Sequence, residues 1–562
     1  MIRRIEAVAL KALIHSGREL ALIDVREHGQ YGEGHLFYAV SMPYSRLELE
    51  LARLVPRKTV QVVLVDEASA RVAERARLRM LAVGYHDVLI LDGGIEAWQA
   101  AGYQCFAGVN VPSKAFGEIA EAVFHTPHLS ARDLHARLAS GESMVVIDGR
   151  PLSEHQKMHI PGARCCPNGE LALRIHEIVP DPKTTVVLHC AGRTRSIIGA
   201  QTLIKLGLPN PVYALENGTQ GWALAGFALE HGPDHRFAAL PIPTPQAPRV
   251  EAAKVWSEQL GIVSIDMNQF FVMQKDSSRT TLLCDVRTAE EFAQGRLADA
   301  LHTPGGQLIQ ATDQFIAVRG ARLVLYDSDN LRAKVVACWL HLLGWEVYVL
   351  KHAERFLKPD VLTQSREYDS IDMQVEMKSK VLTLGDTYSS IKARTIAQAQ
   401  RLINSQTLAD RLLSEPRDRL LLIDVRPSMS FRRAHLSQAV WSIRPRLESL
   451  LETFVQAPAE VILLAEDLGV AELAALECEA WFAARKRDPL IFICTEGPAH
   501  WEASGLRLMQ SASQPSDSDC IDYLFFTHDR HDGNLDAARQ YLAWELALTQ
   551  QIDQAERAAF RL

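Results

Sequence analysis

The chain has 562 residues, too many for one hydrophobic core, so we expect several domains. Its composition, 48% hydrophobic and 23% charged residues, is typical of a globular protein, and the net charge of -8 gives no sign of a nucleic-acid partner. The sequence contains no run of about 18 apolar residues, so it predicts no membrane-spanning helix.

The first residues, "MIRRIEAVALKALIHSG", predict the first helix of a folded domain and not a signal peptide. Glu6 and Lys11 interrupt the apolar residues, and no small-residue cleavage site follows. The chain has nine cysteines and no Cys-x-x-Cys pair, a pattern that argues against a zinc site and a disulfide framework. These features predict a cytoplasmic protein with free thiols, no metal and no other cofactor.

A five-residue motif recurs four times along the chain and marks a repeated unit. It reads "LIDVR" at residues 22–26, "VIDGR" at 146–150, "LCDVR" at 283–287 and "LIDVR" again at 422–426. The aspartates of the motif lie 124, 137 and 139 residues apart, which is the size of a domain. They are Asp24, Asp148, Asp285 and Asp424.

Each unit has the same predicted order of elements. An amphipathic helix precedes a short strand that ends in the Asp-x-Arg motif, and a loop leads to a second apolar strand, a second helix and a third strand. Strands that alternate with helices in this way predict a parallel sheet covered on both faces. We therefore expect four three-layer α/β domains with mainly parallel sheets.

The predicted domains occupy residues 1–112, 126–232, 256–362 and 395–512. The prolines of residues 233–255 predict an extended linker, and a second spacer at about residues 363–394 precedes the fourth domain. Residues 519–562 predict a C-terminal helical tail, in which the stretch from Leu535 to Phe560 forms one long helix. Trp544, Leu546 and Leu548 give this helix an apolar side, so we expect it to dock on a domain or a partner.

The second unit contains a cysteine at the predicted end of a strand and start of a helix, in "VVLHCAGRTRS" at residues 186–196. Ligands of open α/β sheets bind at this end of the strands. The helix start, a curled loop of N–H groups and the charges of Arg193 and Arg195 all favour the thiolate of Cys190 over the thiol. The same loop would hold an anionic sulfur or an approaching oxyanion. Its residues are Ala191, Gly192, Arg193, Thr194 and Arg195.

The other three units lack a cysteine at the equivalent position. The offset of 42 residues from Asp148 to Cys190 leads to Asp66 in the first unit and Asp327 in the third, and an offset of 41 leads to Ala465 in the fourth. We therefore expect one active domain and three inactive ones. The alternative is that the carboxylate of Asp66 or of Asp327 carries out a different reaction in its own unit.

The position of Arg195 holds Arg71, Arg332 and Val470 in the other units. Two of these arginines persist without a cysteine, which also fits a structural clamp between the loop and a carboxylate. The sequence leaves both roles of Arg195 open.

The second unit resembles a rhodanese domain. The resemblance rests on Asp-x-Arg, on "HIPGA" at residues 159–163, on the strand that ends in Cys-x-x-x-x-Arg-Ser, and on Asn-Gly-x-x-x-Trp at 217–222. The whole chain resembles a tandem rhodanese of four domains. The resemblance implies that the Cys190 thiolate takes the outer sulfur of a donor such as thiosulfate, carries it as a persulfide in the cradle of residues 191–195, and passes it to a thiol or cyanide.

Four alternatives concern the reaction, the donor and the partners. A phosphatase of related fold needs an arginine six positions after the cysteine, where this chain has Ser196. The two arginines of the loop favour thiosulfate or a persulfide over mercaptopyruvate as the sulfur donor. The runner-up function is an interaction scaffold that relays sulfur to a protein acceptor, because three units lack the nucleophile. The tail could also dock on a second copy, which leaves a homo-oligomer open.

Other residues of the second unit are weaker candidates. Arg150, Asn168 and Arg174 could contact the donor, although Arg150 recurs in every unit, which favours a structural ion pair with Asp148, and Arg174 fits an exposed helix face. Cys165 and Cys166 fit loop packing better than a resolving thiol.

Overall fold

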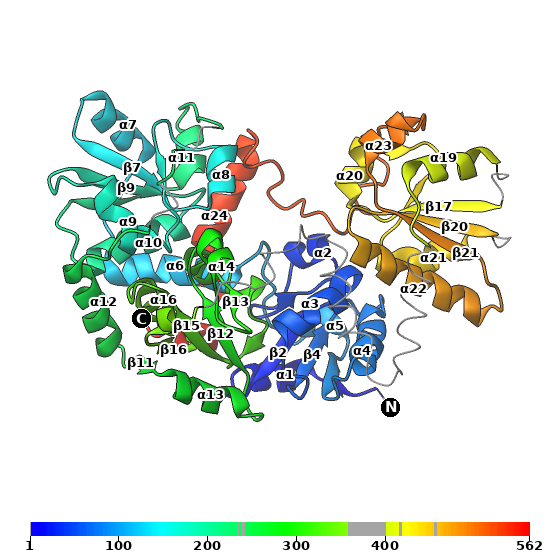
Figure 1. Ribbon diagram of the computed structural model, residues 1–562, viewed down its shortest axis with the longest axis horizontal. Coiled ribbons are helices and arrows are strands. Elements are labelled where there is room, and N and C mark those ends of the chain that lie inside the picture. The colour runs from blue at the N-terminus through cyan, green and yellow to red at the C-terminus, as the bar shows by residue number, and fades with distance from the viewer. Residues whose placement is uncertain (1, 233–234, 238–241, 358–400, 415–418, 455–457) are drawn as a thin grey trace.

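The computed structural model describes residues 2–232, 235–237, 242–357, 401–414, 419–454 and 458–562. It contains four mainly parallel sheets with helices packed on their faces, which confirms the predicted α/β class (Figure 1). We call each sheet with its helices a unit, numbered along the chain. None of the helices in the described ranges has the length and apolar character that a membrane span requires.

Units 1 and 2 precede and follow helix α6 (Val111–Phe124). Unit 1 contains β1 (Arg4–Ile5), α1 (Ala7–Ile14), β2 (Leu20–Asp24), α2 (His28–Glu33), β3 (Val40–Ser41), η1 (Tyr44–Arg46), α3 (Leu47–Leu54), β4 (Val62–Val65), α4 (Val72–Ala82), β5 (Val88–Leu91) and α5 (Gly94–Ala100). Unit 2 contains β6 (His128–Leu129), α7 (Ala131–Ala139), β7 (Met144–Asp148), α8 (Leu152–Lys157), β8 (Arg164–Cys165), α9 (Leu171–Ile178), β9 (Thr185–His189), α10 (Thr194–Lys205), β10 (Val212–Leu215) and α11 (Gly218–Leu224).

Units 3 and 4 are followed by the C-terminal tail with α24 (Leu535–Gln551) and α25 (Gln554–Ala558). Unit 3 contains α12 (Ala247–Gln259), β11 (Val263–Ile265), α13 (Met267–Lys275), β12 (Thr281–Asp285), α14 (Ala289–Gln294), β13 (Leu301–His302), α15 (Gly305–Gln310), η2 (Thr312–Gln314), β14 (Val318–Arg319), β15 (Arg322–Tyr326), α16 (Arg332–Leu342), β16 (Glu346–Leu350) and η3 (Ala353–Arg355). Unit 4 contains α19 (Ser405–Ser414), β17 (Leu420–Asp424), α20 (Ser428–Arg433), β18 (His435–Leu436), β19 (Val440–Trp441), η5 (Arg444–Arg446), α21 (Leu447–Glu452), β20 (Glu460–Leu464), α22 (Leu468–Ala484), β21 (Leu490–Cys494), α23 (Pro498–Ala503) and β22 (Leu508–Met509).

The strands of each unit follow one order. In unit 2 the order is β6-β10-β9-β7-β8, with all neighbours parallel. Units 1 and 3 repeat it, and the described part of unit 4 repeats it as β21-β20-β17-β19. The strand that carries the Asp-x-Arg motif is therefore always next to the strand that precedes the cysteine position, and their carboxyl ends meet at one edge of the sheet.

Both faces of each sheet are buried, which explains why helices cover both. On β4, Val62 and Leu64 lie in one apolar cluster, whereas Val63 and Val65 lie in another on the opposite face. Successive side chains of a strand point to opposite faces, so an uninterrupted apolar strand needs a cover on each side.

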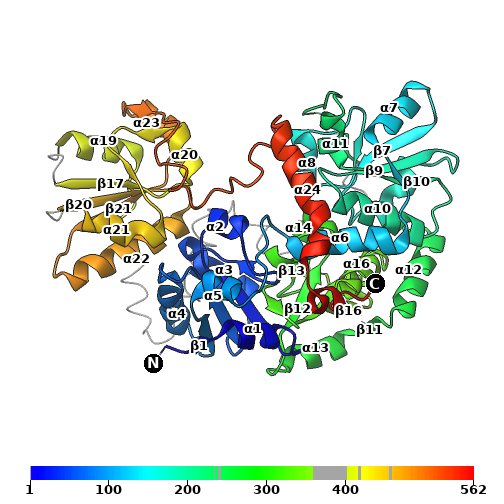
Figure 2. The same ribbon diagram turned by 180° about the vertical axis from the view of Figure 1, so that it is seen from behind.

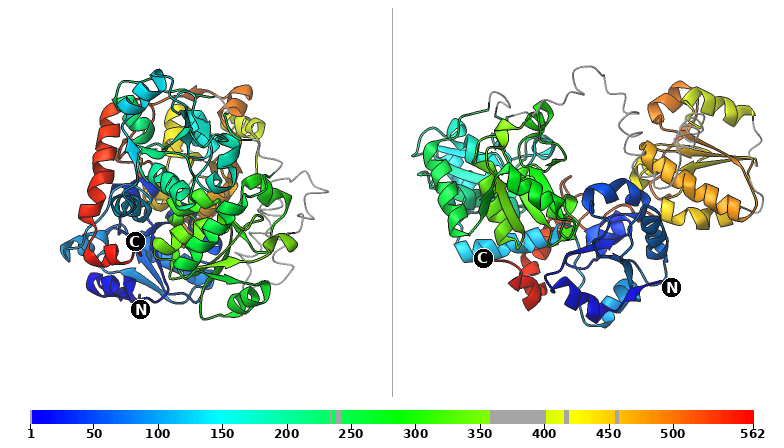
Figure 3. Two further views of the ribbon diagram at one scale, coloured as in Figure 1. Left: turned by 90° about the vertical axis from the view of Figure 1, so that its left-hand side faces the viewer. Right: turned by 60° about the horizontal axis from the view of Figure 1, so that its bottom comes forward.

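Units 1, 2 and 3 and the tail share one apolar cluster. It contains Phe116 of α6, Trp256 of α12, Trp339 of α16 and Leu548 of α24. Strand β14 of unit 3 also pairs antiparallel with β2 of unit 1. The core of unit 4 is separate, and unit 4 lies to one side as a lobe of its own (Figure 3).

Unit 4 contacts unit 1 through charged side chains. The buried guanidinium of Arg444 lies 2.6 Å from the carboxylate of Glu48 and 3.0 Å from that of Glu477. A buried ion pair of this kind fixes an orientation more than it adds stability, because desolvation offsets much of the attraction.

Two segments differ from the sequence-based expectations. Helix α12 occupies the second half of the predicted extended linker 233–255, because Pro248 in its first turn needs no hydrogen-bond acceptor and is compatible with a helix. The tail forms two helices instead of one, since the Asp553 carboxylate caps a new helix start. The predicted spacer at 363–394 lies outside the described residues.

The Asp-x-Arg motif forms the same buried clamp in all four units. In unit 2, Arg150 Nε donates to Asp148 Oδ1 at 2.9 Å, and Arg150 Nη2 donates to Asp148 Oδ2 at 2.7 Å and to a carbonyl eight residues further on. Both side chains are buried. The pairs Asp24–Arg26, Asp285–Arg287 and Asp424–Arg426 repeat all three bonds. This recurrence supports the structural interpretation of Arg150.

We expect Arg287→Met to lower the free energy of unfolding of unit 3 by about 3–5 kcal/mol, because it leaves the Asp285 carboxylate buried without its partner. Hydrogen exchange of β12 and β15 in increasing urea measures this loss. Arg355→Met in the same unit removes an exposed arginine and is expected to cost less than about 1 kcal/mol. Equal losses in the two variants would contradict a buried clamp.

Candidate active site

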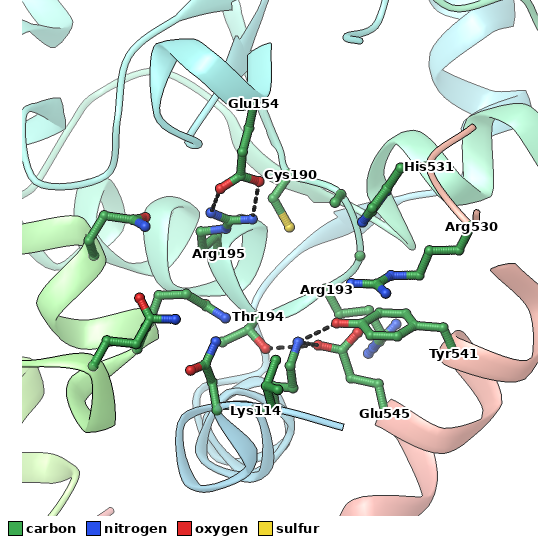
Figure 4. Close-up of a pocket in the computed structure, with 18 residues that line it drawn as sticks. Lys114, Glu154, Cys190, Arg193, Thr194, Arg195, Arg530, His531, Tyr541 and Glu545 are labelled. Carbon is green, nitrogen blue, oxygen red and sulfur yellow. Dashed lines mark hydrogen bonds and ion pairs between the residues drawn. The ribbon is translucent and has the colours of Figure 1, made fainter. Parts of the chain in front are cut away.

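Cys190 lies where the sequence predicts it, after β9 and before α10. Its side chain is 3% exposed, and its Sγ lies 3.2 Å from the hydroxyl of Ser196 (Figure 4). Apolar β9 brings the cysteine to the edge of the sheet, and α10 begins at Thr194. The thiol therefore lies at the N-terminus of helix α10, just before its first turn.

The loop after Cys190 is a cradle of N–H donors. The N–H groups of residues 191–195 donate to no acceptor in the described part of the chain. The carbonyls of Cys190 and Ala191 point the other way and accept from the N–H groups of Thr219 and Gln220 at 2.9 and 3.1 Å. Consecutive N–H groups with this orientation bind anions.

Gly218 allows α11 to hold the loop in this orientation. A Cβ on this residue would lie 2.2 Å from the carbonyl oxygen of Cys190, and its φ of +51° is in the left-handed region. Only glycine is compatible with both constraints. This explains the glycine of the Asn-Gly-x-x-x-Trp motif.

In units 1 and 3 an aspartate carboxylate fills the equivalent cradle. Asp327 accepts hydrogen bonds from the N–H groups of Asn330, Leu331 and Ala333 at 2.8–3.0 Å. Asp66 accepts from the N–H group of Ala73 at 2.9 Å in the same way. Carboxylates of the chain itself thus accept from these N–H donors.

Unit 4 closes its loop with a different aspartate. Ala465 provides no acceptor, but Asp467, two residues later, accepts from the N–H groups of Gly469 and Val470 at the start of α22. Of the four described loops, three therefore place a carboxylate of their own against the N–H groups of the loop. The loop after Cys190 does not.

The two arginines of the cradle are paired with glutamates, and for Arg195 this confirms the alternative of a clamp between the loop and a carboxylate. The Arg195 guanidinium makes two bonds to the Glu154 carboxylate, at 2.7 and 2.8 Å. Arg193 is bound by Glu118, at 2.8 Å, and by Glu121, both on α6. Local sequence could not show this, because the α6 glutamates lie far from Arg193 along the chain.

Unit 3 contains the same clamp as Arg195–Glu154. Arg332 Nη2 bonds to Glu291 at 2.7 Å, and Glu291 has the same offset from the Asp-x-Arg motif as Glu154. The clamp occurs without a cysteine, which supports a structural role for Arg195 beside any role toward the substrate.

The weaker candidates lie outside the cavity that adjoins Cys190. Asn168 Nδ2 donates to the carbonyl of Arg195 at 2.8 Å and supports the cradle from behind. Arg150 belongs to the clamp described above. Arg174 is buried, with ion pairs to Glu170 and Glu177, so the expectation of an exposed helix face is wrong.

Cys165 and Cys166 are also buried away from the cavity. The Sγ of Cys165 lies 3.5 Å from the carbonyl of Arg150. Burial raises the pKa of the Cys166 thiol well above its usual range. Both observations favour loop packing over a resolving thiol.

The cavity in front of Cys190 has a volume of about 210 Å³ and is built by four parts of the chain (Figure 4). They are the segment that begins α6, unit 2, the α15–η2 region of unit 3, and the C-terminal tail. The sequence-based prediction missed every residue from outside unit 2. Those with charged or titratable side chains are Lys114, Arg530, His531, Tyr541 and Glu545.

The tail docks on units 1 and 2 of its own chain. Figure 2 shows α24 crossing α6 and passing beside α11. Leu548 is fully buried, and the ring of Trp544 packs so closely on Gly108 that a Cβ there would lie 2.6 Å from it. The carboxylate of Glu545 accepts a hydrogen bond from the hydroxyl of Thr194 at 3.0 Å, so α24 directly contacts the cradle.

The fold and this cradle define a class, the α/β units that expose a thiol at a helix N-terminus lined by free N–H groups. The family model of the rhodanese-like domain matches residues 6–101, 130–225 and 272–353. The chain is 36% identical to a thiosulfate sulfurtransferase from Pseudomonas aeruginosa, whose crystal structure aligns over 100% of this chain and 99% of that chain with a TM-score of 0.83. The chain therefore belongs to the tandem rhodanese family.

Two curated proteins match a single stretch of the chain. The "Putative sulfur carrier protein YrkF" of Bacillus subtilis is 30% identical over 96 residues, which are 17% of this chain and 50% of that protein. The "HTH-type transcriptional regulator Rv0324" of Mycobacterium tuberculosis is 32% identical over 104 residues, 18% of this chain and 45% of that protein. The chain spans about half the length of these relatives.

We expect Gly108→Ala to displace α24, because the new methyl group would overlap the Trp544 ring. Gly102→Ala is the matched control: its φ of +85° imposes the same backbone strain as the +82° of Gly108, but nothing lies within 4 Å of the added Cβ. Faster hydrogen exchange of residues 535–551 and a red-shifted tryptophan emission in the Gly108 variant alone would confirm the packing. Identical behaviour of the two variants would contradict it.

We expect the stability of unit 1 to fall as the pH rises from about 4 to about 7. Burial raises the pKa of Asp66 to about 6, from its usual value of about 4, so in this window the unfolded chain releases a proton that the folded chain retains. The total loss is about 3 kcal/mol. Asp66→Asn cannot titrate, so hydrogen exchange of β4 in urea should show this pH dependence in the wild type and a flatter profile in the variant. Equal slopes would contradict a raised pKa.

Proposed function

We propose that the chain moves sulfane sulfur from a small anionic donor, thiosulfate in the first place, to a thiol or cyanide through a persulfide on Cys190. Membership of the rhodanese family supports sulfur transfer in general. The observation that carries the specific proposal is the open cradle: Cys190 is the thiol beside five N–H groups that no described acceptor occupies. A persulfide is an anion, and this loop is suited to hold one.

The first step conserves atoms and charge. The Cys190 thiolate attacks the outer sulfur of thiosulfate, a new sulfur–sulfur bond forms to Cys190, and the bond between the two donor sulfurs breaks. Its electron pair leaves with sulfite. In the second step a thiolate or cyanide attacks the outer sulfur of the persulfide and regenerates the Cys190 thiolate, which is covalent catalysis with two half-reactions.

The dimensions of the site favour a small donor. The cavity of about 210 Å³ has room for a small anion, and the tail covers the cysteine, whose side chain is 3% exposed. A protein acceptor would need displacement of α24 before it reached the sulfur. The alternative, a scaffold that relays sulfur to a protein, is favoured by the three cradles that carboxylates close and by the separate lobe of unit 4.

We expect Cys190→Ala to lose thiosulfate:cyanide sulfur transfer at least about 1,000-fold, because no other thiol lies at an open cradle. Mass spectrometry after incubation with thiosulfate should show about 32 Da, one sulfur atom, on the Cys190 peptide. Cys105→Ala, which removes a partly exposed thiol that does not line the cavity, is the control and should keep its activity.

Full activity of the Cys190 variant would overturn the assignment. Comparing kcat/KM for thiosulfate, mercaptopyruvate and glutathione persulfide then ranks the donors, with thiosulfate expected first. Rapid turnover of small substrates by the purified chain would count against the alternative of a scaffold that relays sulfur to a protein. Sulfur transfer that needs a protein acceptor and a displaced tail would favour that alternative.

A further inference from the structure

We propose that Arg530, which the C-terminal tail places in the cavity, binds the oxyanion end of the sulfur donor and selects donors that carry one. This inference rests on the proposed function, since it assigns a residue to the same site. It makes the tail a part of the active site that lies outside the catalytic unit.

Charge pairing in the cavity singles out Arg530. Every other side chain of fixed charge that lines the cavity has a partner of opposite charge: Lys114 with Glu545, Arg193 with Glu118, and Arg195 with Glu154. Arg530 forms no ion pair with any residue in the described ranges. The lining therefore carries one uncompensated positive charge, and an anionic ligand would neutralise it.

The tail holds the Arg530 side chain in place without neutralising it. Its guanidinium lies over the ring of Tyr541, 4.4 Å from the centroid, and Nη1 donates to the hydroxyl of Thr527 at 2.9 Å. The Nε group is buried and has no described partner. The phenol of Tyr541 is in turn bound by Lys114, so the arginine rests on a supported aromatic platform.

Figure 4 shows Arg530 and His531 extending from the tail toward the space in front of the Cys190 sulfur. Burial and the charge of Arg530 lower the pKa of His531 to about 3, so this imidazole is neutral and adds no charge. Its Nδ1 is buried without a described partner and remains available for a hydrogen bond to a ligand. The two residues together form a polar wall opposite the cradle.

The chemistry of thiosulfate requires a second anion-binding group of this kind. The cradle can hold the sulfur that is transferred, but the other end of the donor carries three oxygens and departs as sulfite with two negative charges. A guanidinium matches such an oxyanion with parallel hydrogen bonds. Because charge accumulates on the leaving sulfite, a cation at this place stabilises the transition state and also the product.

The experiment compares two donors on the full chain. For Arg530→Gln we expect kcat/KM for thiosulfate to fall about 10- to 100-fold, the usual effect of removing a charge-assisted bond to an anion. Ethyl persulfide has no oxyanion: the Cys190 thiolate takes its outer sulfur and ethanethiolate leaves. Its kcat/KM should change less than about 3-fold. Arg530→Lys keeps the charge and should recover most of the thiosulfate activity.

Sulfite binding provides a readout that does not depend on turnover. Calorimetry with sulfite should show an affinity about 10- to 100-fold weaker for Arg530→Gln than for the wild type. Arg539→Gln removes a paired, exposed arginine from the outer side of α24 and is the matched control, expected to leave both measurements unchanged.

Two results would overturn the proposal. Equal losses with both donors would mean that Arg530 only keeps the tail docked, and unchanged sulfite affinity would mean that it does not bind the oxyanion. The sulfite affinity does not depend on formation of the persulfide. If Cys190 formed no persulfide while Arg530→Gln still weakened sulfite binding, the proposed function would fail and the anion site would stand.

Discussion

The buried pair of aspartate and arginine at the end of one central strand is the constraint on which each unit depends. Its carboxylate is fully buried in all four units, and the arginine also bonds to a carbonyl eight residues later, which fixes the loop that returns to the sheet. The neighbouring strand ends beside this pair and carries the cysteine position. A buried charge without its partner costs several kcal/mol, so the geometry around the clamp has little freedom to vary between units.

Consecutive N–H groups such as those of the cradle favour an acceptor beside them, because buried N–H groups without acceptors are costly. Asp66 and Asp327 supply that acceptor from the chain itself, and Asp467 does so in unit 4. Cys190 leaves the same donors free. Under the proposed function, the inactive units and the active unit differ in what meets these N–H groups: a carboxylate of the chain in the former and a sulfur that can leave in the latter.

Sequence reasoning reached the repeat, the α/β class, the mainly parallel sheets and the place of Cys190, since all of these follow from local patterns. It failed where the determining contact is distant. Glu118 and Glu121 of α6 neutralise Arg193, and no local pattern indicated that pairing, whereas a clamp between Arg195 and a carboxylate was one of the two expected roles of that arginine. Arg174 was expected on an exposed helix face, yet it is buried. The tail's apolar side predicted docking, but no local signal said that α24 would contact Thr194 and that Arg530 would enter the cavity.

The sequence by itself determined which unit has a thiol at this register position and which units have a carboxylate or a methyl group there, because these groups differ in chemistry whatever surrounds them. Only the tertiary structure decided what the thiol faces. The charge of the cavity is a sum over four parts of the chain, and it depends on which glutamate lies within bonding distance of which arginine. That distance is set by the shared core of units 1, 2 and 3 and the tail, which bury apolar surface together and so bring Lys114, Arg530 and Glu545 to the same cysteine.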